Sequence, residues 1–216
     1  MSVMGRALVW LKDLLFPTYC VSCKAEGVWL CQACFPKNTI VENCIFEAVE
    51  GRSYLDGLTA FFSYGENPAS ELLRMLKYKY ITEVLAELRQ LVVGASGYPK
   101  LDGFVIMSVP LHPRRERERG FNQASYIANL ISEKLNLPIC QRLFRKIYTK
   151  QQAKLSGEER RKNLNEAFVF SDNNSIPKKV LLIDDVFTTG STMQECAKVL
   201  KNAGVKTVWG MVLAKG

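Results

Sequence analysis

The sequence lacks several features that would assign it directly to a class of protein. No apolar stretch approaches the roughly 18 uninterrupted residues that a membrane span requires. No internal repeat or low-complexity tract is present, and a composition of 48% hydrophobic and 23% charged residues excludes disordered, collagen-like and coiled-coil chains. The G-x-x-x-x-G-K-S/T loop of P-loop NTPases and the G-x-G-x-x-G loop of dinucleotide-binding domains are also absent.

The amino terminus lacks the pattern of a secretory signal peptide. Residues 2–16 predict a short amphipathic helix that ends before Pro17. Lys12 and Asp13 interrupt its apolar run before any small-residue cleavage site. We therefore expect a cytoplasmic protein.

Positive charge is concentrated in one part of the chain. The whole sequence has a net charge of +8, and residues 114–162 alone carry 13 basic and 5 acidic side chains. A local basic surface favours an anionic partner, either a phosphorylated small molecule or nucleic acid. A solvated face that only aids solubility would give the same pattern, so charge alone does not choose between these alternatives.

Four of the seven cysteines form the pattern C-x2-C-x7-C-x2-C: Cys20, Cys23, Cys31 and Cys34. Each C-x-x-C pair can turn two thiolates toward one point, and two such pairs complete a tetrahedral zinc site. The site would be structural, because four thiolates leave no open coordination position. An iron–sulfur cluster and an empty, degenerate site are the alternatives. The odd number of cysteines argues against a disulfide framework.

Strands and helices alternate along the rest of the chain, which predicts an α/β fold with an open parallel sheet flanked by helices. We expect strands at residues 58–64, 104–109, 179–183 and 205–213. We expect helices at residues 69–77, 82–93 and 122–135, and a basic helix that opens with a possible capping box at 156–159. A second capping box, at residues 192–195, predicts the last helix, with Met193, Cys196, Ala197 and Leu200 facing inward. The cysteine module is expected in residues 1–50 and the α/β domain in residues 51–216.

The most informative stretch is Lys179–Thr192, in which an apolar strand ends in Asp184 and Asp185 and a small-residue loop precedes a helix. Ligands of open α/β sheets bind at the carboxyl ends of strands. Successive N–H groups at a helix start form an anion pocket, so the loop can hold a phosphate. The two carboxylates can hold vicinal hydroxyls or a hydrated magnesium ion, and a ribose 5-phosphate carries both features. A ligand-free strand–turn–helix is the alternative, although neighbouring carboxylates without a counter-ion repel each other.

Asp184–Thr192 (DDVFTTGST) resembles the phosphoribosyl diphosphate (PRPP) motif of type I phosphoribosyltransferases. Nearly the whole chain resembles the ComF competence family, whose members join a cysteine-rich amino-terminal module to such a domain. The other matching segments are the double C-x-x-C pattern, Val109–Pro113, Arg119–Ala124, Gln152–Ser156, Arg160 and Asn163. The resemblance implies a type I phosphoribosyltransferase-like fold, a small zinc-knuckle module and a role in DNA uptake during natural transformation.

The resemblance also implies a role for each part of the motif. Asp184 and Asp185 would hold the ribose 2′- and 3′-hydroxyls, with Mg²⁺ accompanying PRPP. The 5-phosphate loop would consist of Val186, Thr188, Thr189, Gly190, Ser191 and Thr192. The pyrophosphate turn would consist of Pro110, Leu111, His112 and Arg114. A catalytic member would displace pyrophosphate at ribose C1 by a nucleophile; we assign no general base, and no residue pattern identifies the acceptor.

A basic run follows the pyrophosphate turn and contains Arg114, Arg115, Arg117 and Arg119, with Glu116 and Glu118 between them. Guanidinium groups match phosphate geometry, so this run could close over pyrophosphate as a mobile lid. The alternative is a solvated loop whose arginines pair with the glutamates. His112, the only histidine, could contact phosphate, act as a base, or pack in the turn for structural reasons.

Two functions without catalysis fit the same sequence. One is a single-stranded-DNA-binding accessory protein that works with DNA-uptake proteins through residues 114–162 and the zinc module. Its stacking platforms would be Phe121, Tyr126, Phe144 or Tyr148. The other is a sensor that binds PRPP or a nucleotide without turnover. DNA binding through several phosphates would weaken steeply with added salt, which helps to separate these functions.

Overall fold

The computed structural model describes residues 17–35, 41–45, 53–79, 81–147, 167–171 and 175–216. The helices predicted at residues 2–16 and from residue 156 lie outside the described residues. The chain divides into two compact units, Met1–Asn38 with Gly65–Leu91, and Thr39–Tyr64 with Val92–Gly216. The domain boundary expected at residue 50 also lies outside the described residues and stays a prediction. Within the described part of the chain, no helix combines the length and apolar character needed to cross a membrane.

The first unit contains the cysteine pattern and a succession of short helices. Helix α2 (Pro68–Arg74) begins where the Asn67 side chain accepts a 2.8 Å hydrogen bond from the Ser70 N–H. A π-helical turn, η1 (Met75–Lys79), follows directly, and a 3-10 turn, η2 (Thr82–Val84), leads into α3 (Leu85–Gly94), whose last three residues belong to the second unit. The helices predicted at residues 69–77 and 82–93 are confirmed.

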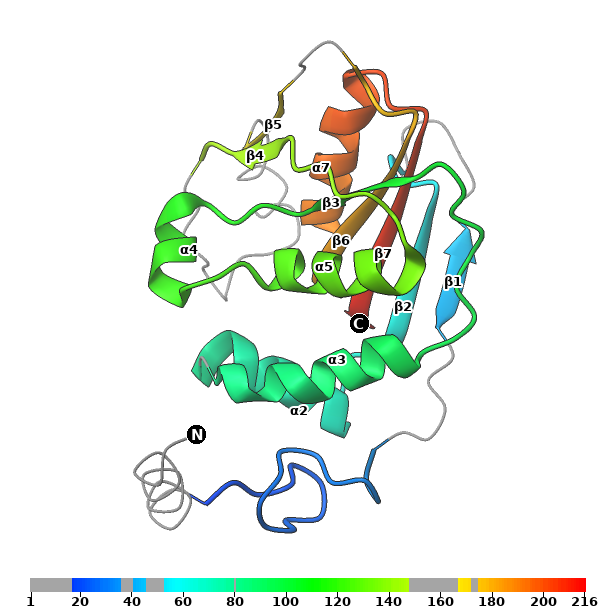
Figure 1. Ribbon diagram of the computed structural model, residues 1–216. Helices are drawn as coiled ribbons and strands as arrows, with labels where there is room; N and C mark the ends of the chain where they lie inside the picture. The colour runs from blue at the N-terminus through cyan, green and yellow to red at the C-terminus, as the bar shows by residue number, and fades with distance from the viewer. Residues whose placement is uncertain (1–16, 36–40, 46–52, 80, 148–166, 172–174) are drawn as a thin grey trace, which may run out of the picture. The chain divides into compact units, whose positions relative to one another are not determined.

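The second unit is built around a five-stranded sheet in the order β1-β2-β7-β6-β3. The four strands β2 (Gly57–Ser63), β7 (Thr207–Lys215), β6 (Lys179–Phe187) and β3 (Val105–Ser108) are parallel (Figure 1). They confirm all four predicted strands and the α/β class. Strand β1 (Glu42–Ile45) pairs with β2 in the antiparallel direction at one edge. It was not predicted, because its four residues are largely exposed and show no apolar alternation.

Among the described residues of the second unit, three helices and a two-stranded ribbon accompany the sheet. Helix α5 (Gln123–Leu135) packs against β3 and β6 and confirms the helix predicted at residues 122–135. Helix α7 (Ser191–Asn202) begins two residues earlier than the capping box predicted, with Gly190 as its N-cap in place of Thr192. The capping box at residues 192–195 is therefore wrong, because Thr192 lies inside the first turn. The sequence analysis did not predict α4 (Pro113–Arg119), nor the antiparallel ribbon of β4 (Leu143–Arg145) and β5 (Phe168–Phe170).

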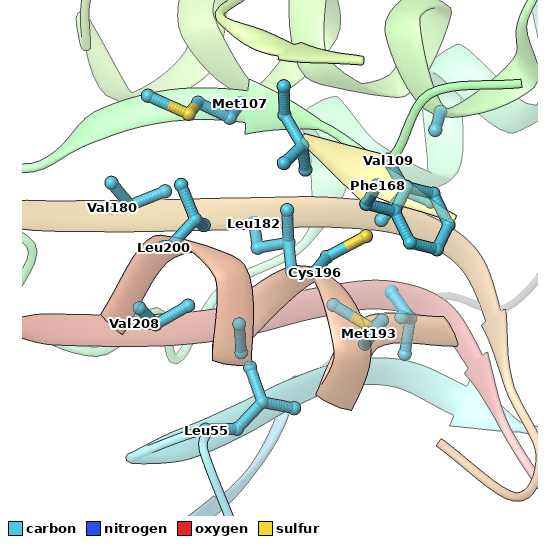
Figure 2. Packing of buried hydrophobic residues seen from close by; sticks show 14 of the residues in the cluster. Leu55, Met107, Val109, Phe168, Val180, Leu182, Met193, Cys196, Leu200 and Val208 are labelled. Carbon is cyan, nitrogen blue, oxygen red and sulfur yellow. The ribbon is translucent and has the colours of Figure 1, made fainter. Parts of the chain in front are cut away.

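The core of the second unit lies between the sheet and α7. Met193, Cys196, Ala197 and Leu200 of α7 are all buried, as predicted. They belong to one cluster with side chains of β3, β6, β7 and the ribbon (Figure 2). The neighbouring β6 residues Leu181 and Ile183 are 0% exposed although they alternate with the members of this cluster, so both faces of β6 are covered. The packed sheet gives the loops at its carboxyl edge a rigid base.

Candidate functional site

The carboxyl ends of β3 and β6 lie next to each other in the second unit. Pairing between them stops at Ser108 and Ile183, and the Val109 N–H adds a 2.8 Å bond to the Ile183 carbonyl. The chain of β3 then turns away at Pro110, whereas β7 continues to pair with β6 as far as Phe187. Among the residues that the structure describes, one side of β6 thus has no strand partner from Asp184 onward, at the edge where parallel α/β sheets bind ligands.

The two carboxylates of β6 occupy different environments. Asp185 is buried, with 8% exposure, while Asp184 is half-buried. The Asp185 N–H donates a 2.8 Å hydrogen bond to Asp184 Oδ1. Because successive residues of a strand alternate between faces, Asp184 shares the α7 face of β6 with Leu182, and Asp185 lies on the other. Both lie at the end of the strand, directly before the loop that leads to α7.

The loop after β6 depends on the backbone conformation of Gly190. This residue has a φ of 70°, in the left-handed region that favours glycine, and a Cβ built on it would collide with the Phe187 ring. Thr188 and Thr189 are exposed, and the Thr189 hydroxyl lies 2.9 Å from the buried Ser191 hydroxyl. Because Gly190 brings no side-chain acceptor to the N-terminus of α7, the first-turn N–H groups of this 12-residue helix suit an anionic ligand.

The turn after β3 leads into a helix rather than a loop. Pro110 is buried, and His112 Nδ1 accepts a 3.2 Å bond from the Arg114 N–H at the start of α4. In this structure the histidine therefore caps the helix. The left-handed Gly120 ends α4, with φ 82°. Residues 114–119 thus belong to one short helix.

The arginines of α4 differ in exposure and in partners. Arg114 Nε lies 3.1 Å from Glu118 Oε1 on the exposed surface. Such a pair is what we expect if the arginines pair with the neighbouring glutamates in a solvated segment. Arg117 is exposed, while Arg115 and Arg119 are half-buried. Arg119 donates a 3.2 Å hydrogen bond to the side chain of Gln123. Arg115 and Arg119 are therefore the members of the run held closest to the body of the unit.

Asn122 joins the start of α5 to the end of β3. Its side-chain amide donates to the Val109 carbonyl at 3.0 Å, and its Oδ1 caps α5 by accepting a 3.0 Å bond from the Ala124 N–H. Gln123, which is 2% exposed, has a buried Nε2 with no hydrogen-bond partner among the described residues. The segment Arg119–Ala124 therefore fixes the turn after β3 in place.

The predicted ligand residues at the end of β6 and at the start of α7 lie in one continuous segment, and the predicted pyrophosphate turn follows β3, the strand that pairs with β6. Gln152–Ser156, Arg160 and Asn163 lie outside the described residues. The sequence analysis assigned no role to Arg145, which lies on β4 and interacts electrostatically with Asp184 and Arg115. No sequence signal marked it, because β4 and β5 are only three residues each and pair across more than twenty residues of chain.

The four cysteines of the C-x2-C-x7-C-x2-C pattern converge in the first unit. Their sulfur atoms all lie within 4.8 Å of one another, and Cys23 Sγ lies 3.5 Å from Cys31 Sγ. The Gly27 N–H bonds to the Thr18 carbonyl at 2.8 Å, and the left-handed Gly27 closes the turn between the two pairs. Sulfur ligands of a tetrahedral zinc ion lie about 3.8 Å apart, given Zn–S bonds of about 2.3 Å. The cluster could therefore hold a metal ion.

The thiols of this cluster differ in acidity. Burial raises the pKa of Cys20, but hydrogen bonds from the backbone N–H groups of Cys31, Cys23 and Ser22 outweigh burial and lower it to about 6. The Ala25 N–H lowers the pKa of Cys23, but the neighbouring thiols of Cys31, Cys34 and Cys20 raise it to about 11. A pKa lowered to about 6 favours the thiolate form of Cys20 at neutral pH, and the proximity of the sulfur atoms opposes ionisation of Cys23 unless a cation is present.

A groove of about 450 Å³ lies within the first unit, beside the cysteine cluster. Its lining includes the aromatic side chains of Tyr19 and Trp29 and the cations Lys24, Arg74 and Lys79. It also includes the carboxylates of Glu66 and Glu71, and Glu71 pairs with Arg74 at 2.8 Å. Tyr19 is 46% exposed and Lys24 and Lys79 are exposed, so these groups face solvent in the described structure. An aromatic surface next to cations suits a base and its phosphate.

Comparison with known proteins agrees with this architecture. Residues 122–216 match the phosphoribosyl transferase domain model, and this segment contains α5, β6 and α7. Competence protein F of Haemophilus influenzae is 33% identical over 210 residues, which cover 92% of this chain and 86% of that protein. The chain belongs to the ComF family. This ComF-family protein carries both a four-cysteine cluster and a segment that matches the phosphoribosyl transferase domain.

Two further ComF-family relatives cover the chain less completely. The DNA utilization protein YhgH of Salmonella typhi is 34% identical over 152 residues, which cover 65% of this chain and 64% of that protein. Competence protein ComFC of Streptococcus pneumoniae is 29% identical over 159 residues, which cover 72% of this chain and 62% of that protein.

Proposed function

We propose that this protein binds PRPP, or a related ribose 5-phosphate ligand, together with Mg²⁺ at the carboxyl edge of β6. The observation that supports this most is the order of groups along one short segment: two carboxylates, a loop closed by the left-handed Gly190, and the N-terminus of α7. The loop of Val186 and Thr188–Thr192 would hold the 5-phosphate through N–H and hydroxyl groups. Asp184 and Asp185 would hold the ribose hydroxyls.

The turn Pro110–Arg114 would receive the pyrophosphate group, with Arg115, Arg117 and Arg119 of α4 as neighbouring cations. Mg²⁺ bound with PRPP would neutralise charge on the leaving pyrophosphate. The arginines would stabilise the same charge through guanidinium hydrogen bonds. In a catalytic cycle, a nucleophile would attack ribose C1 as pyrophosphate departs. A sensor that binds PRPP without turnover uses the same residues, so ligand binding is the part of the proposal to test first.

The test is the melting temperature of the full chain with PRPP and Mg²⁺, each alone and together. A ligand at 100 times its Kd stabilises the folded state by about 2.7 kcal/mol, a rise of roughly 5 to 11 °C for a chain of this size. The double variant Asp184→Asn/Asp185→Asn should lose this rise, and Asp102→Asn, at an exposed carboxylate elsewhere in the second unit, should keep it. Absence of a shift in the wild-type protein would remove PRPP as the ligand. Pyrophosphate release with nucleobases, amines or DNA present then tests for turnover.

We also propose that Cys20, Cys23, Cys31 and Cys34 hold one structural zinc ion. The support is the convergence of four sulfur atoms within 4.8 Å of one another in the first unit. Metal analysis of protein purified without chelator should give about one zinc per chain, and Cys31→Ser should lose most of it. Cys140→Ser, a control at a cysteine outside the cluster, should keep the zinc. Protein that folds fully with no metal bound would contradict this assignment.

The relatives named for competence suggest that the chain acts in DNA uptake. We propose this role for the whole chain, with DNA-uptake proteins as its partners. The test is complementation of an H. influenzae strain that lacks competence protein F. The wild-type gene should restore transformation, and the Asp184→Asn/Asp185→Asn gene should not. Full complementation by the double variant would separate DNA uptake from the PRPP site.

A second candidate function is single-stranded DNA binding, which the aromatic and cationic groove of the first unit favours. Trp29 and Tyr19 would stack bases, and Lys24 and Lys79 would contact phosphates. Each phosphate contact to a single strand contributes roughly 0.7 to the slope of log binding constant against log salt concentration. Removing both lysines should therefore reduce the magnitude of this slope by about 1.4. Trp29→Ala should weaken binding at all salt concentrations, while Tyr54→Ala, at an exposed tyrosine of the second unit, should not. An unchanged salt slope would place DNA binding elsewhere, for example on the basic segment 114–162.

A further inference from the structure

Arg145 lies on the inner side of the β4–β5 ribbon. Side chains alternate along β4: Leu143 is 0% exposed, Phe144 is 48% exposed, and Arg145 is half-buried. Leu143 and Arg145 therefore leave the same side of the strand. Because Leu143 belongs to the core cluster of the second unit, this is the side that faces the sheet. The ribbon thus carries a guanidinium group on its packed side, next to buried apolar residues.

The packing around Arg145 locates it at the carboxyl edge of the sheet. Its Cζ lies 5.2 Å from the centroid of the Phe168 ring, on the paired strand β5. Phe168 belongs to the same core cluster as Val109 and Met193, and Figure 2 shows these three at the end of the cluster beyond Leu182, where the strands finish. Val109 immediately precedes the turn that begins at Pro110. The Phe168 ring therefore holds the guanidinium near that turn.

The electrostatic surroundings of Arg145 indicate an anion site. Burial, and next the like charge of Arg115 on α4, lower the pKa of Arg145, whereas Cys196 on α7 and then Asp184 on β6 raise it. The Arg145 charge thus interacts with groups on two different elements, Arg115 on α4 and Asp184 on β6. Two guanidinium groups that repel each other would both be stabilised by a multiply charged anion bound with them.

We propose that Arg145 binds the pyrophosphate group of PRPP together with Arg115. This inference rests on the proposed function and adds to it a residue from a separate element, the β4–β5 ribbon. Its geometry favours binding, because Phe168 and the strand backbone restrain the Arg145 stem before the ligand arrives. The ribose 5-phosphate part of the ligand, which carries no pyrophosphate, would not use this residue.

The experiment compares the affinities of three titrants, each in the presence of Mg²⁺: PRPP, inorganic pyrophosphate and ribose 5-phosphate. Arg145→Met keeps the apolar stem over Phe168 but removes the charge. It should weaken PRPP and pyrophosphate binding by about 10- to 100-fold and change ribose 5-phosphate binding by less than about threefold. The affinity of Arg145→Lys for PRPP and pyrophosphate should lie between those of the wild type and Arg145→Met. Lysine keeps the positive charge but lacks the planar guanidinium group that can donate two parallel hydrogen bonds. Lys146→Met is the matched control, at an exposed neighbouring cation, and should bind all three as wild type does.

Each outcome decides the role of Arg145. A folded Arg145→Met or Arg145→Lys protein that binds PRPP and pyrophosphate like wild type would overturn the inference. Equal loss of all three titrants would also overturn it, because a purely structural role predicts that result. Wild-type protein that binds pyrophosphate but not PRPP would contradict the proposed function, while the pyrophosphate comparison would still decide Arg145. Wild-type protein that binds neither would refute both.

Discussion

Substitution of Gly190 by alanine tests how the loop after β6 is built. The residue has a φ of 70°, and a left-handed conformation costs an L-residue about 1 to 2 kcal/mol relative to glycine. The added Cβ would also collide with the Phe187 ring, which must move out of its half-buried position. Displacing a packed ring costs about 1 kcal/mol more, so the total loss of unfolding free energy is about 2 to 3 kcal/mol.

A matched control separates the two contributions. Gly103 has a φ of 74°, but a Cβ at this position has no heavy atom within 4 Å. Gly103→Ala should therefore show only the conformational cost, about 1 to 2 kcal/mol in urea unfolding. The double variant Gly190→Ala/Phe187→Ala should lose less stability than the sum of its two single variants, because the collision is absent.

Gly190→Ala should also weaken PRPP binding, because the loop backbone shifts while Asp184 and Asp185 remain. Gly103→Ala should leave the affinity unchanged. If the two alanine variants lose equal stability and bind PRPP alike, Gly190 neither crowds Phe187 nor shapes the ligand loop. The reasoning about this loop would then be refuted.

Three other predictions address the core, the α5 cap and the cysteine cluster. Leu200→Ala, at a fully buried position of α7, should lower the unfolding free energy by about 2 to 5 kcal/mol in urea titration, and a loss below 1 kcal/mol would contradict the packing described. Asn122→Ala removes both the α5 cap and the bond to Val109 and should cost about 1 to 3 kcal/mol by the same assay; an unchanged midpoint would show that the turn is held by other groups. In metal-free protein, thiolate absorbance at 240 nm should rise near pH 6 as Cys20 ionises, and Cys20→Ser should lack this step. Because the folded pKa is lowered, the stability that this thiolate contributes is full above the ordinary thiol pKa and is lost as the pH falls through about 6; a first rise only above pH 8 would contradict the hydrogen bonds assigned to its sulfur.

The sequence predicted the parts of the fold that have strong local signals. The apolar run of β6, the periodicity of α5 and the spacing of the four cysteines each determine their own local structure. Strand β6 nonetheless extends to Phe187, four residues beyond the predicted end, because β7 continues to pair with it after β3 has turned away. That extension depends on a tertiary neighbour, so residues 179–187 alone do not predict it.

Helix α4 shows a different kind of failure. Its signals are present in the sequence, with Pro113 at the first position and Gly120 at the end. The density of charge at residues 114–119 instead favours a mobile lid or a solvated loop, the two alternatives of the sequence analysis. At Thr192 the opposite happens: the sequence contains a capping-box pattern, but the helix does not begin there. The left-handed Gly190 is the N-cap instead, one residue before the helix begins.

The position of Arg145 near the candidate site could not be predicted from the sequence, and the reason is physical. Three-residue strands such as β4 and β5 have too few residues to show alternation, and their pairing spans a long intervening segment. The electrostatic interaction of Arg145 with Asp184 and Arg115 arises only when the ribbon packs on the core. A ligand role for a residue on such short elements can therefore be proposed only from the three-dimensional structure.

The most direct test of the central claim is a crystal structure of the full chain with PRPP and Mg²⁺. We expect the 5-phosphate within hydrogen-bond distance of the backbone N–H groups of residues 188–192, and the ribose hydroxyls on Asp184 and Asp185. A ligand bound elsewhere, with the loop between β6 and α7 empty or closed by other side chains, would contradict the account.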